Sequence, residues 1–278
     1  MTMMIVTQGF AEVNGTQLYY EMAGQGEPLV LIHARLLHSG QWDEQFLEFA
    51  QYYRVIRYDV RGFGKSRMRD SGSDVEDLRA LLDYLHIDHA HLLGLSMGAE
   101  IALNFVLDHP ERVSSLELIS SGLDGYEYSE ATMREWQQFV TPVMARNFEK
   151  AMDIYTTTWV DGPILPADPA VRERARSLMQ GYNFAHYFAH EDQLTQILDT
   201  SSLGHYQPPS ERLGEINIPT LIVTGDLDQA DVIAIGKTLH RGIGGSTRET
   251  IKGAAHLVNM QKPTNFNNVV LDFLRSLH

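Results

Sequence analysis

Short, continuously apolar runs alternate along this chain with segments whose apolar residues recur at helical spacing. An apolar run of about four to eight residues between turn residues is typical of a strand buried on both faces. Asn14-Gly15 separates two further short segments near the start, which predicts a β-hairpin. The expected strands are 10–13, 17–22, 28–33, 53–58, 90–95, 113–119, 219–224 and 247–252, and the helices that alternate with them are 41–51, 75–85, 99–109, 231–239 and 263–277. The chain is therefore predicted to be an α/β protein with a mostly parallel eight-stranded sheet and helices on both faces.

The alternation stops in the middle of the chain. Between residues 122 and 208 the sequence predicts no buried strand, and instead two amphipathic helices at 131–157 and 169–197. A loop with Gly162, Pro163 and Pro166 separates them. The alternation resumes directly afterwards, so we expect one α/β core made of residues 1–121 and 209–278, with 122–208 as a helical insertion.

Charge and cysteine content exclude several classes of protein. The formal net charge is −14, and an acidic surface repels nucleic acid and anionic membranes. The 278 residues include no cysteine, which excludes disulfides, thiolate zinc sites and a cysteine nucleophile. The N-terminus lacks the pattern of a signal peptide, and no apolar run approaches the ~20 residues of a transmembrane helix. We expect a cytoplasmic protein with neither a nucleic-acid nor a membrane partner.

Residues 94–98 form the motif G-x-S-x-G, with Ser96 at its centre. The motif lies between an expected strand and an expected helix, which is the context of a nucleophile elbow. Glycines allow the close backbone contacts of a sharp turn, and the N-terminus of the helix directs N–H groups towards a developing oxyanion. We therefore predict that Ser96 is a nucleophile rather than an inert turn residue.

A serine nucleophile needs a histidine to accept its proton and a carboxylate to orient that histidine. Among twelve histidines, His256 follows the last expected strand, at the carboxyl edge of the sheet where such sites lie. The acid is expected after the preceding strand, where Asp228 lies deepest in the turn. We expect Asp226 to accept N–H groups of the loop and Asp231 to be the N-cap or a first-turn residue of the next helix.

Two sequence features could in principle bind a metal. The run from Asp226 to Asp231 lacks the Gly and Glu that a calcium loop requires. His186 and His190 are four residues apart, but no third ligand accompanies them, so we interpret them as exposed residues of a helix. We expect neither a metal nor a cofactor.

Taken together, these segments resemble the α/β-hydrolase superfamily over nearly the whole chain. Residues 31–35 are similar to the family's H-G-x segment, and 59–66 to its D-x-R-G-x-G-x-S loop. Residues 94–98 match the elbow, whereas 225–228 and 253–256 resemble the acid and histidine loops. The resemblance implies that the helical insertion is a cap over the site.

The resemblance also implies an oxyanion hole made of two backbone N–H groups, those of Met97 and Arg35. This chain departs from the family pattern here, because Ala34 replaces the usual glycine and Arg35 is unusual at its position. Arg35 has two interpretations: a surface residue paired with a carboxylate of the cap, or a pocket residue that binds an acidic substrate or plugs the cleft.

Other residues have supporting roles in the prediction. His33 and Asp59 are expected to hold loops through hydrogen bonds. The candidate substrate contacts are Arg35, Trp159 and Leu257. Further candidate pocket walls in the cap are Tyr182, His186, Tyr187 and Phe188.

The predicted function is serine-dependent hydrolysis of a small-molecule ester or lactone through an acyl-enzyme, by a monomer or homodimer. A cofactor-free haloperoxidase or perhydrolase, a carbon–carbon bond hydrolase and an enol-lactone hydrolase would use the same triad. A small-molecule receptor or signalling protein on the same fold is the non-enzymatic alternative.

Overall fold

The computed structural model describes residues 4–67, 72–162, 168–180 and 207–277. Its eight strands form one sheet in the order β1-β2-β4-β3-β5-β6-β7-β8. The strands are β1 (Val6–Val13), β2 (Thr16–Ala23), β3 (Pro28–Ile32), β4 (Arg54–Tyr58), β5 (Ala90–Leu95), β6 (Val113–Ile119), β7 (Thr220–Gly225) and β8 (Thr247–Ile251). The β1–β2 and β2–β4 pairs are antiparallel and every other neighbouring pair is parallel, which confirms the predicted sheet.

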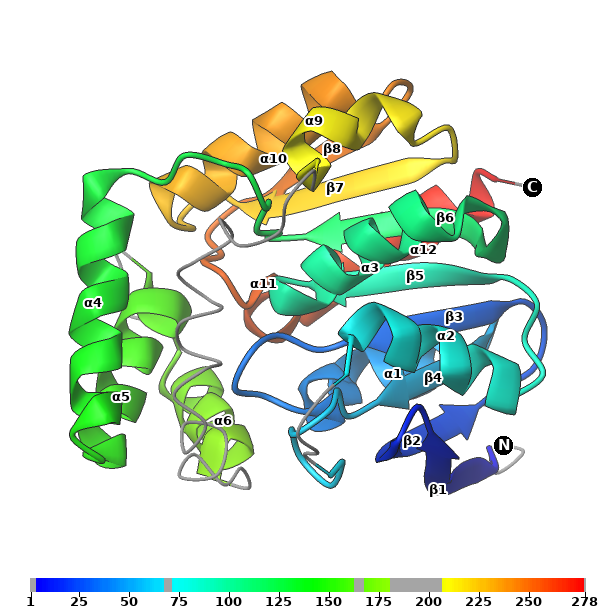
Figure 1. Ribbon diagram of the computed structural model, residues 1–278, viewed down its shortest axis with the longest axis horizontal. Helices are drawn as coiled ribbons and strands as arrows, with labels where there is room; N and C mark the ends of the chain where they lie inside the picture. The colour runs from blue at the N-terminus through cyan, green and yellow to red at the C-terminus, as the bar shows by residue number, and fades with distance from the viewer. Residues whose placement is uncertain (1–3, 68–71, 163–167, 181–206, 278) are drawn as a thin grey trace.

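Helices cover both faces of the sheet (Figure 1). The first face carries α2 (Asp74–Tyr84), α3 (Met97–Asp108), α9 (Pro209–Arg212) and α10 (Ala230–Gly242). The other carries α1 (Asp43–Phe49), α11 (Val258–Gln261) and α12 (Pro263–Arg275). The described connections also contain the short 3-10 turns η1 (Ser39–Trp42), η2 (Pro110–Arg112) and η4 (Leu213–Glu215).

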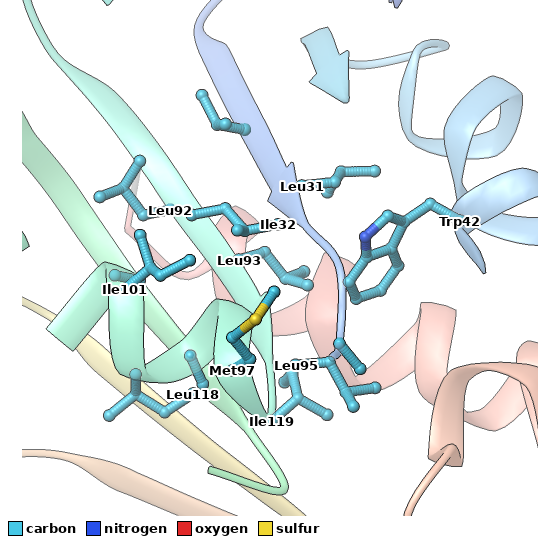
Figure 2. Packing of buried hydrophobic residues seen from close by; sticks show 14 of the residues in the cluster. Leu31, Ile32, Trp42, Leu92, Leu93, Leu95, Met97, Ile101, Leu118 and Ile119 are labelled. Carbon is cyan, nitrogen blue, oxygen red and sulfur yellow. The ribbon is translucent and has the colours of Figure 1, made fainter. Parts of the chain in front are cut away.

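The core lies on both sides of the central strands. All six residues of β5 are buried, as a strand covered on both faces requires. Figure 2 shows Leu92 beside Ile101 of α3, and Leu31 on the side of Trp42. A shift by one residue would exchange the side chains of the two faces, so the fit of these side chains against the helices on each face fixes the register of the strands.

The expected helical insertion divides into shorter elements than the sequence predicts. The predicted helix 131–157 is instead α4 (Glu130–Met144), α5 (Phe148–Tyr155) and the π-helical turn η3 (Thr156–Asp161). Pro142 lies inside α4 and Arg146 has a φ of 55°, so the helical path breaks between α4 and α5. Of the second predicted helix, α6 (Pro169–Gln180) is described, and residues 181–197 lie outside the described residues.

The helices of the insertion gather beyond the carboxyl ends of the parallel strands (Figure 1). In open α/β sheets this edge is where ligands bind, because the loops that follow the strands converge there. Within the described part of the chain, no helix is both long and apolar enough to cross a membrane.

Candidate active site

Ser96 lies at a sharp turn between β5 and α3. Its φ of 54° and ψ of −116° are unfavourable for a residue with a side chain, and its N–H donates to the Ile119 carbonyl of the neighbouring strand, with N···O at 2.9 Å. A Cβ on Gly94 would collide with the Gly98 carbonyl, so the turn needs glycine there. The local sequence thus accounts for the strained backbone that the elbow motif predicts.

The start of α3 is pressed against the end of β3. A Cβ on Gly98 would collide with the carbonyl of Ile32 and would lie 2.9 Å from that of His33. Because glycine has no Cβ, the turn that carries Ser96 and Met97 lies beside the segment that begins at His33. The structure therefore brings the two predicted oxyanion donors, in Met97 and Arg35, to neighbouring segments.

His256 and Asp228 form a buried pair at the same edge of the sheet. His256 Nδ1 lies 3.0 Å from Asp228 Oδ1 and 3.2 Å from Oδ2, and the two residues are only 4% and 3% exposed. Asp228 Oδ1 also accepts the Gln229 N–H at 2.8 Å. A carboxylate oxygen only accepts hydrogen bonds, so Nδ1 carries a hydrogen, and in the neutral form of the ring Nε2 then has a free lone pair.

The other two aspartates of the loop make different contacts. Asp226 Oδ1 accepts the Gly253 N–H at 2.6 Å, as predicted for a residue that satisfies loop N–H groups. Asp231 lies in the first turn of α10 and accepts the Ser129 N–H at 2.8 Å. Neither of these two hydrogen bonds involves His256, whereas the carboxyl of Asp228 lies against its ring.

A cavity of about 860 Å³ opens at this edge. Its lining includes Ser96, Met97, His256, Arg35 and Trp159, so it contains most of the residues that the sequence singles out. Leu257 is fully buried and is absent from the described lining. The side chain of Leu257 packs into the core, and its contact with substrate stays a prediction.

Trp159 covers His256 from the insertion. Its ring centroid lies 4.8 Å from that of His256, with an angle of 55° between the planes. Two glutamines of the core hold the backbone on either side of it: Gln229 Nε2 donates to the Thr158 carbonyl at 2.9 Å, and Gln261 Nε2 to that of Val160 at 2.7 Å. These bonds fix the position of Trp159 over the histidine.

Arg35 is half-buried and lies among acidic side chains of the core. Burial, helped by Asp77, raises the pKa of the Asp74 carboxyl to about 6, against the lowering effect of Arg35. Burial also raises the pKa of the Glu100 carboxyl, and Arg35 again lowers it. Both carboxyls line the same cavity as Arg35, which favours the pocket interpretation of this residue.

His33 and Asp59 hold loops, as predicted. Asp59 accepts the N–H groups of Ser39 and Lys65, at 2.8 and 2.7 Å. His33 Nε2 accepts the Val60 N–H at 2.9 Å, so the hydrogen is on Nδ1, which donates to the Ala34 carbonyl at 2.8 Å. Burial lowers the pKa of His33 to about 4, and its ring is neutral at pH 7.

Some residues of the site carry no recognisable sequence signal. Tyr155 donates from its hydroxyl to the Arg35 carbonyl at 3.1 Å, and Trp136 packs on Trp159 at a centroid distance of 5.5 Å. Both lie on amphipathic helices, where an aromatic residue is more often part of the packing between helices. The structure alone shows that they line the cavity.

Among the described residues, no group of three or more His, Asp or Glu is arranged to hold a metal ion. The candidate cap residues Tyr182, His186, Tyr187, Phe188 and His190 lie outside the described residues.

An eight-stranded sheet of this order, with a serine elbow after β5, defines the architecture of an α/β hydrolase. The family model for the alpha/beta hydrolase fold matches residues 27–165, and the chain belongs to this family.

Known proteins resemble the chain over nearly its whole length. A 2-hydroxy-6-oxo-6-phenylhexa-2,4-dienoate hydrolase of Comamonas testosteroni is 26% identical, over 97% of this chain and 96% of its own. A bromoperoxidase of Bacillus anthracis has a solved structure with a TM-score of 0.82 and 27% identity, covering 97% of this chain and 100% of its own. The structure of an N-acyl homoserine lactone degrading enzyme gives a TM-score of 0.74 at 25% identity, covering 95% and 100%.

Proposed function

We propose that this protein is a serine hydrolase in which Ser96, His256 and Asp228 form the catalytic triad. The observation that carries the proposal is the buried His256–Asp228 pair, whose histidine lines the same cavity as a serine held in a strained turn. A positioned base is what converts a serine hydroxyl into a nucleophile. The insertion 122–208 acts in this proposal as the cap, since Trp159 closes the cavity above the base.

In the proposed reaction His256 Nε2 takes the proton of Ser96 as its oxygen attacks a carbonyl carbon. The oxyanion that forms accepts hydrogen bonds from the N–H groups of Met97 and Arg35. The tetrahedral intermediate then collapses, and His256 returns the proton to the leaving group. Water repeats the sequence on the acyl-enzyme, which releases the acid and restores Ser96.

The substrate class that the relatives favour is a 2-hydroxy-6-oxo-dienoate. A molecule such as 2-hydroxy-6-oxo-6-phenylhexa-2,4-dienoate contains neither an ester nor an amide. Its hydrolysis at the 6-oxo carbon therefore breaks a carbon–carbon bond, and the leaving carbon takes the proton that His256 carries. Arg35 lies in the cavity and is the residue that we assign to the substrate carboxylate.

A neutral ester or lactone is the second candidate, and the charge of the cavity favours it. Asp74, Glu100 and Asp124 line the cavity together with Arg35 and Arg61, and these acidic residues oppose the entry of a carboxylate. The likeness to an N-acyl homoserine lactone degrading enzyme points in the same direction.

A substrate panel with Ser96→Ala as control tests both candidates. We expect a fluorophosphonate to label the wild-type chain stoichiometrically at Ser96, and the variant to show neither labelling nor turnover. Faster cleavage of the dienoate than of p-nitrophenyl esters and acyl lactones would support the first candidate, and the reverse order the second. A wild-type chain that is neither labelled nor active would overturn the proposal and favour a receptor.

A further inference from the structure

The two peptide groups on either side of Ala34 are each held by a buried side chain. Gln41 Oε1 accepts the Ala34 N–H at 2.8 Å, and His33 Nδ1 donates to the Ala34 carbonyl at 2.8 Å. Ala34, His33 and Gln41 are all fully buried. Water therefore does not compete for these hydrogen bonds, and the backbone at Ala34 has little freedom to rotate.

The second of these peptide groups carries the N–H of Arg35. A trans peptide is planar, so its N–H points opposite to its carbonyl oxygen. Holding the Ala34 carbonyl therefore fixes the direction of the Arg35 N–H. Gln41 fixes the preceding peptide plane, so that Ala34 cannot turn about its backbone dihedrals without losing a buried hydrogen bond.

Gln41 also ties this segment to the part of the chain that follows His256. The Gln41 carbonyl accepts the side-chain amide of Asn259 in α11, with Nδ2···O at 3.0 Å. One buried residue thus contacts both the segment of the proposed oxyanion donor and the helix next to the proposed base. Within the described residues Gln41 Nε2 has no hydrogen-bond partner, so the acceptor Oε1 is the functional half of this amide.

We propose that Gln41 is a positioning residue that aims the N–H of Arg35 at the oxyanion. This inference rests on the proposed serine hydrolase function. Gln41 acts through Ala34, without touching substrate. Loss of its acceptor leaves the Ala34 N–H buried and unpaired, so the preceding peptide plane is no longer held, while the Ala34 carbonyl keeps its bonds to His33 Nδ1 and to the Leu37 N–H, at 2.8 and 3.2 Å. The backbone at Ala34 then shifts about these remaining bonds, and the Arg35 N–H shifts with it.

The consequence is a loss in the rate of the chemical step. An oxyanion donor stabilises the transition state more than it stabilises the bound substrate. Misalignment of the donor therefore lowers kcat and leaves KM nearly unchanged. Loss of a whole donor costs about 10²- to 10³-fold in kcat. For a displaced donor we expect about a 10- to 100-fold fall.

Gln41→Met tests the proposal, with Gln45→Met as its matched control. Methionine has nearly the volume of glutamine but does not offer the strong acceptor. Gln45 is equally buried, and its described hydrogen bonds go to Asn259 and Asn267 and not to Ala34. Both variants should lower the melting temperature, and only Gln41→Met should lower kcat.

Two further measurements separate positioning from general loss of structure. Inhibition by phenylboronic acid, which forms a tetrahedral adduct on the serine, should weaken in Gln41→Met by the same factor as kcat. Gln41→Glu keeps the acceptor oxygen and should restore most of kcat. If Gln41→Met does not fold, Gln41→Asn, which is one methylene too short to reach Ala34, takes its place.

An active Gln41→Met enzyme with unchanged kcat and unchanged boronate inhibition would overturn the inference. A fall in kcat of the same size in Gln45→Met would also overturn it, since the role would then be structural. Failure of the proposed function is recognised separately, because the wild-type chain would then show no fluorophosphonate label and no turnover.

Discussion

Trp159 of the insertion packs on His256 of the core, with ring centroids 4.8 Å apart. Trp159 lies on the π-helical turn η3, and the side chains of Gln229 and Gln261 hold the backbone on either side of it. The ring that is proposed to move the proton therefore lies against a wall supplied by the insertion. Binding and chemistry are expected to be coupled at this contact.

Replacement of Trp159 by alanine removes this wall. We expect KM to rise about 10-fold, because a large aromatic surface that faces the substrate is lost. The melting temperature should also fall, since a nearly buried tryptophan leaves a cavity. Steady-state kinetics and thermal unfolding measure the two effects, and Trp159→Phe should show a smaller change in each. Unchanged KM in Trp159→Ala would place the substrate elsewhere.

The assignment of the triad acid is tested by a pair of aspartates two positions apart. Asp228→Asn removes the charge that orients and stabilises His256, and kcat should fall by about 10⁴-fold. Asp226→Asn changes a carboxylate that accepts the N–H of Gly253 in the loop. In this variant kcat should stay near the wild-type value. Single-turnover acylation rates provide the measurement. Equal losses in the two variants would contradict the assignment.

Arg35 should decide between acidic and neutral substrates. Arg35→Gln keeps the backbone N–H and removes the positive charge from a cavity that Asp74 and Glu100 also line. We expect cleavage of a carboxylated substrate to fall about 10-fold more than cleavage of a neutral ester. The ratio of the two kcat/KM values is the measurement. If both fall in equal proportion, Arg35 does not recognise substrate charge.

Glu117 should make the stability of the fold depend on pH. The carboxyl is fully buried in β6, where it accepts the hydroxyl of Ser115, and burial raises its pKa from 4.5 to about 8. The folded state then binds a proton that the unfolded state releases above pH 4.5. This contribution is fully present below pH 4.5 and is lost as the pH rises to about 8.

The loss amounts to at most about 5 kcal/mol, from ~1.4 kcal/mol for each unit of pKa difference. Glu117→Gln keeps the shape of the side chain without a titrating proton. Between about pH 5 and about pH 8, the free energy of unfolding of this variant should therefore fall less than that of the wild-type protein. Urea unfolding of both proteins over this range is the measurement. Parallel pH profiles of the two proteins would show that Glu117 makes no such contribution.

The features that the sequence predicts correctly all depend on local patterns. The buried strands follow from continuous apolar runs, and the elbow follows from glycines around Ser96 that only a tight turn requires. The order of strands and helices also locates Asp228 and His256, since each lies in the loop directly after a strand. Chain connectivity carries this information, because loops after parallel strands meet at one edge.

Other features were decided by contacts between segments that are distant in the sequence. Leu257, which follows His256 in the sequence, lies fully buried in the core. The last part of the helix predicted for 131–157 winds into the π-helical turn η3, whose backbone is held by Gln229 and Gln261 from distant segments.

The site shows the same division between local and distant information. The amino-acid sequence by itself determined the sheet, the elbow and the loops that carry a base and an acid, because backbone conformation and apolar periodicity are local properties. Only the tertiary structure decided that Trp159 covers His256, that Tyr155 bonds to Arg35 and that Gln41 holds Ala34. Each of these contacts depends on the direction and distance at which two separate elements pack, and the composition of either element alone does not fix them.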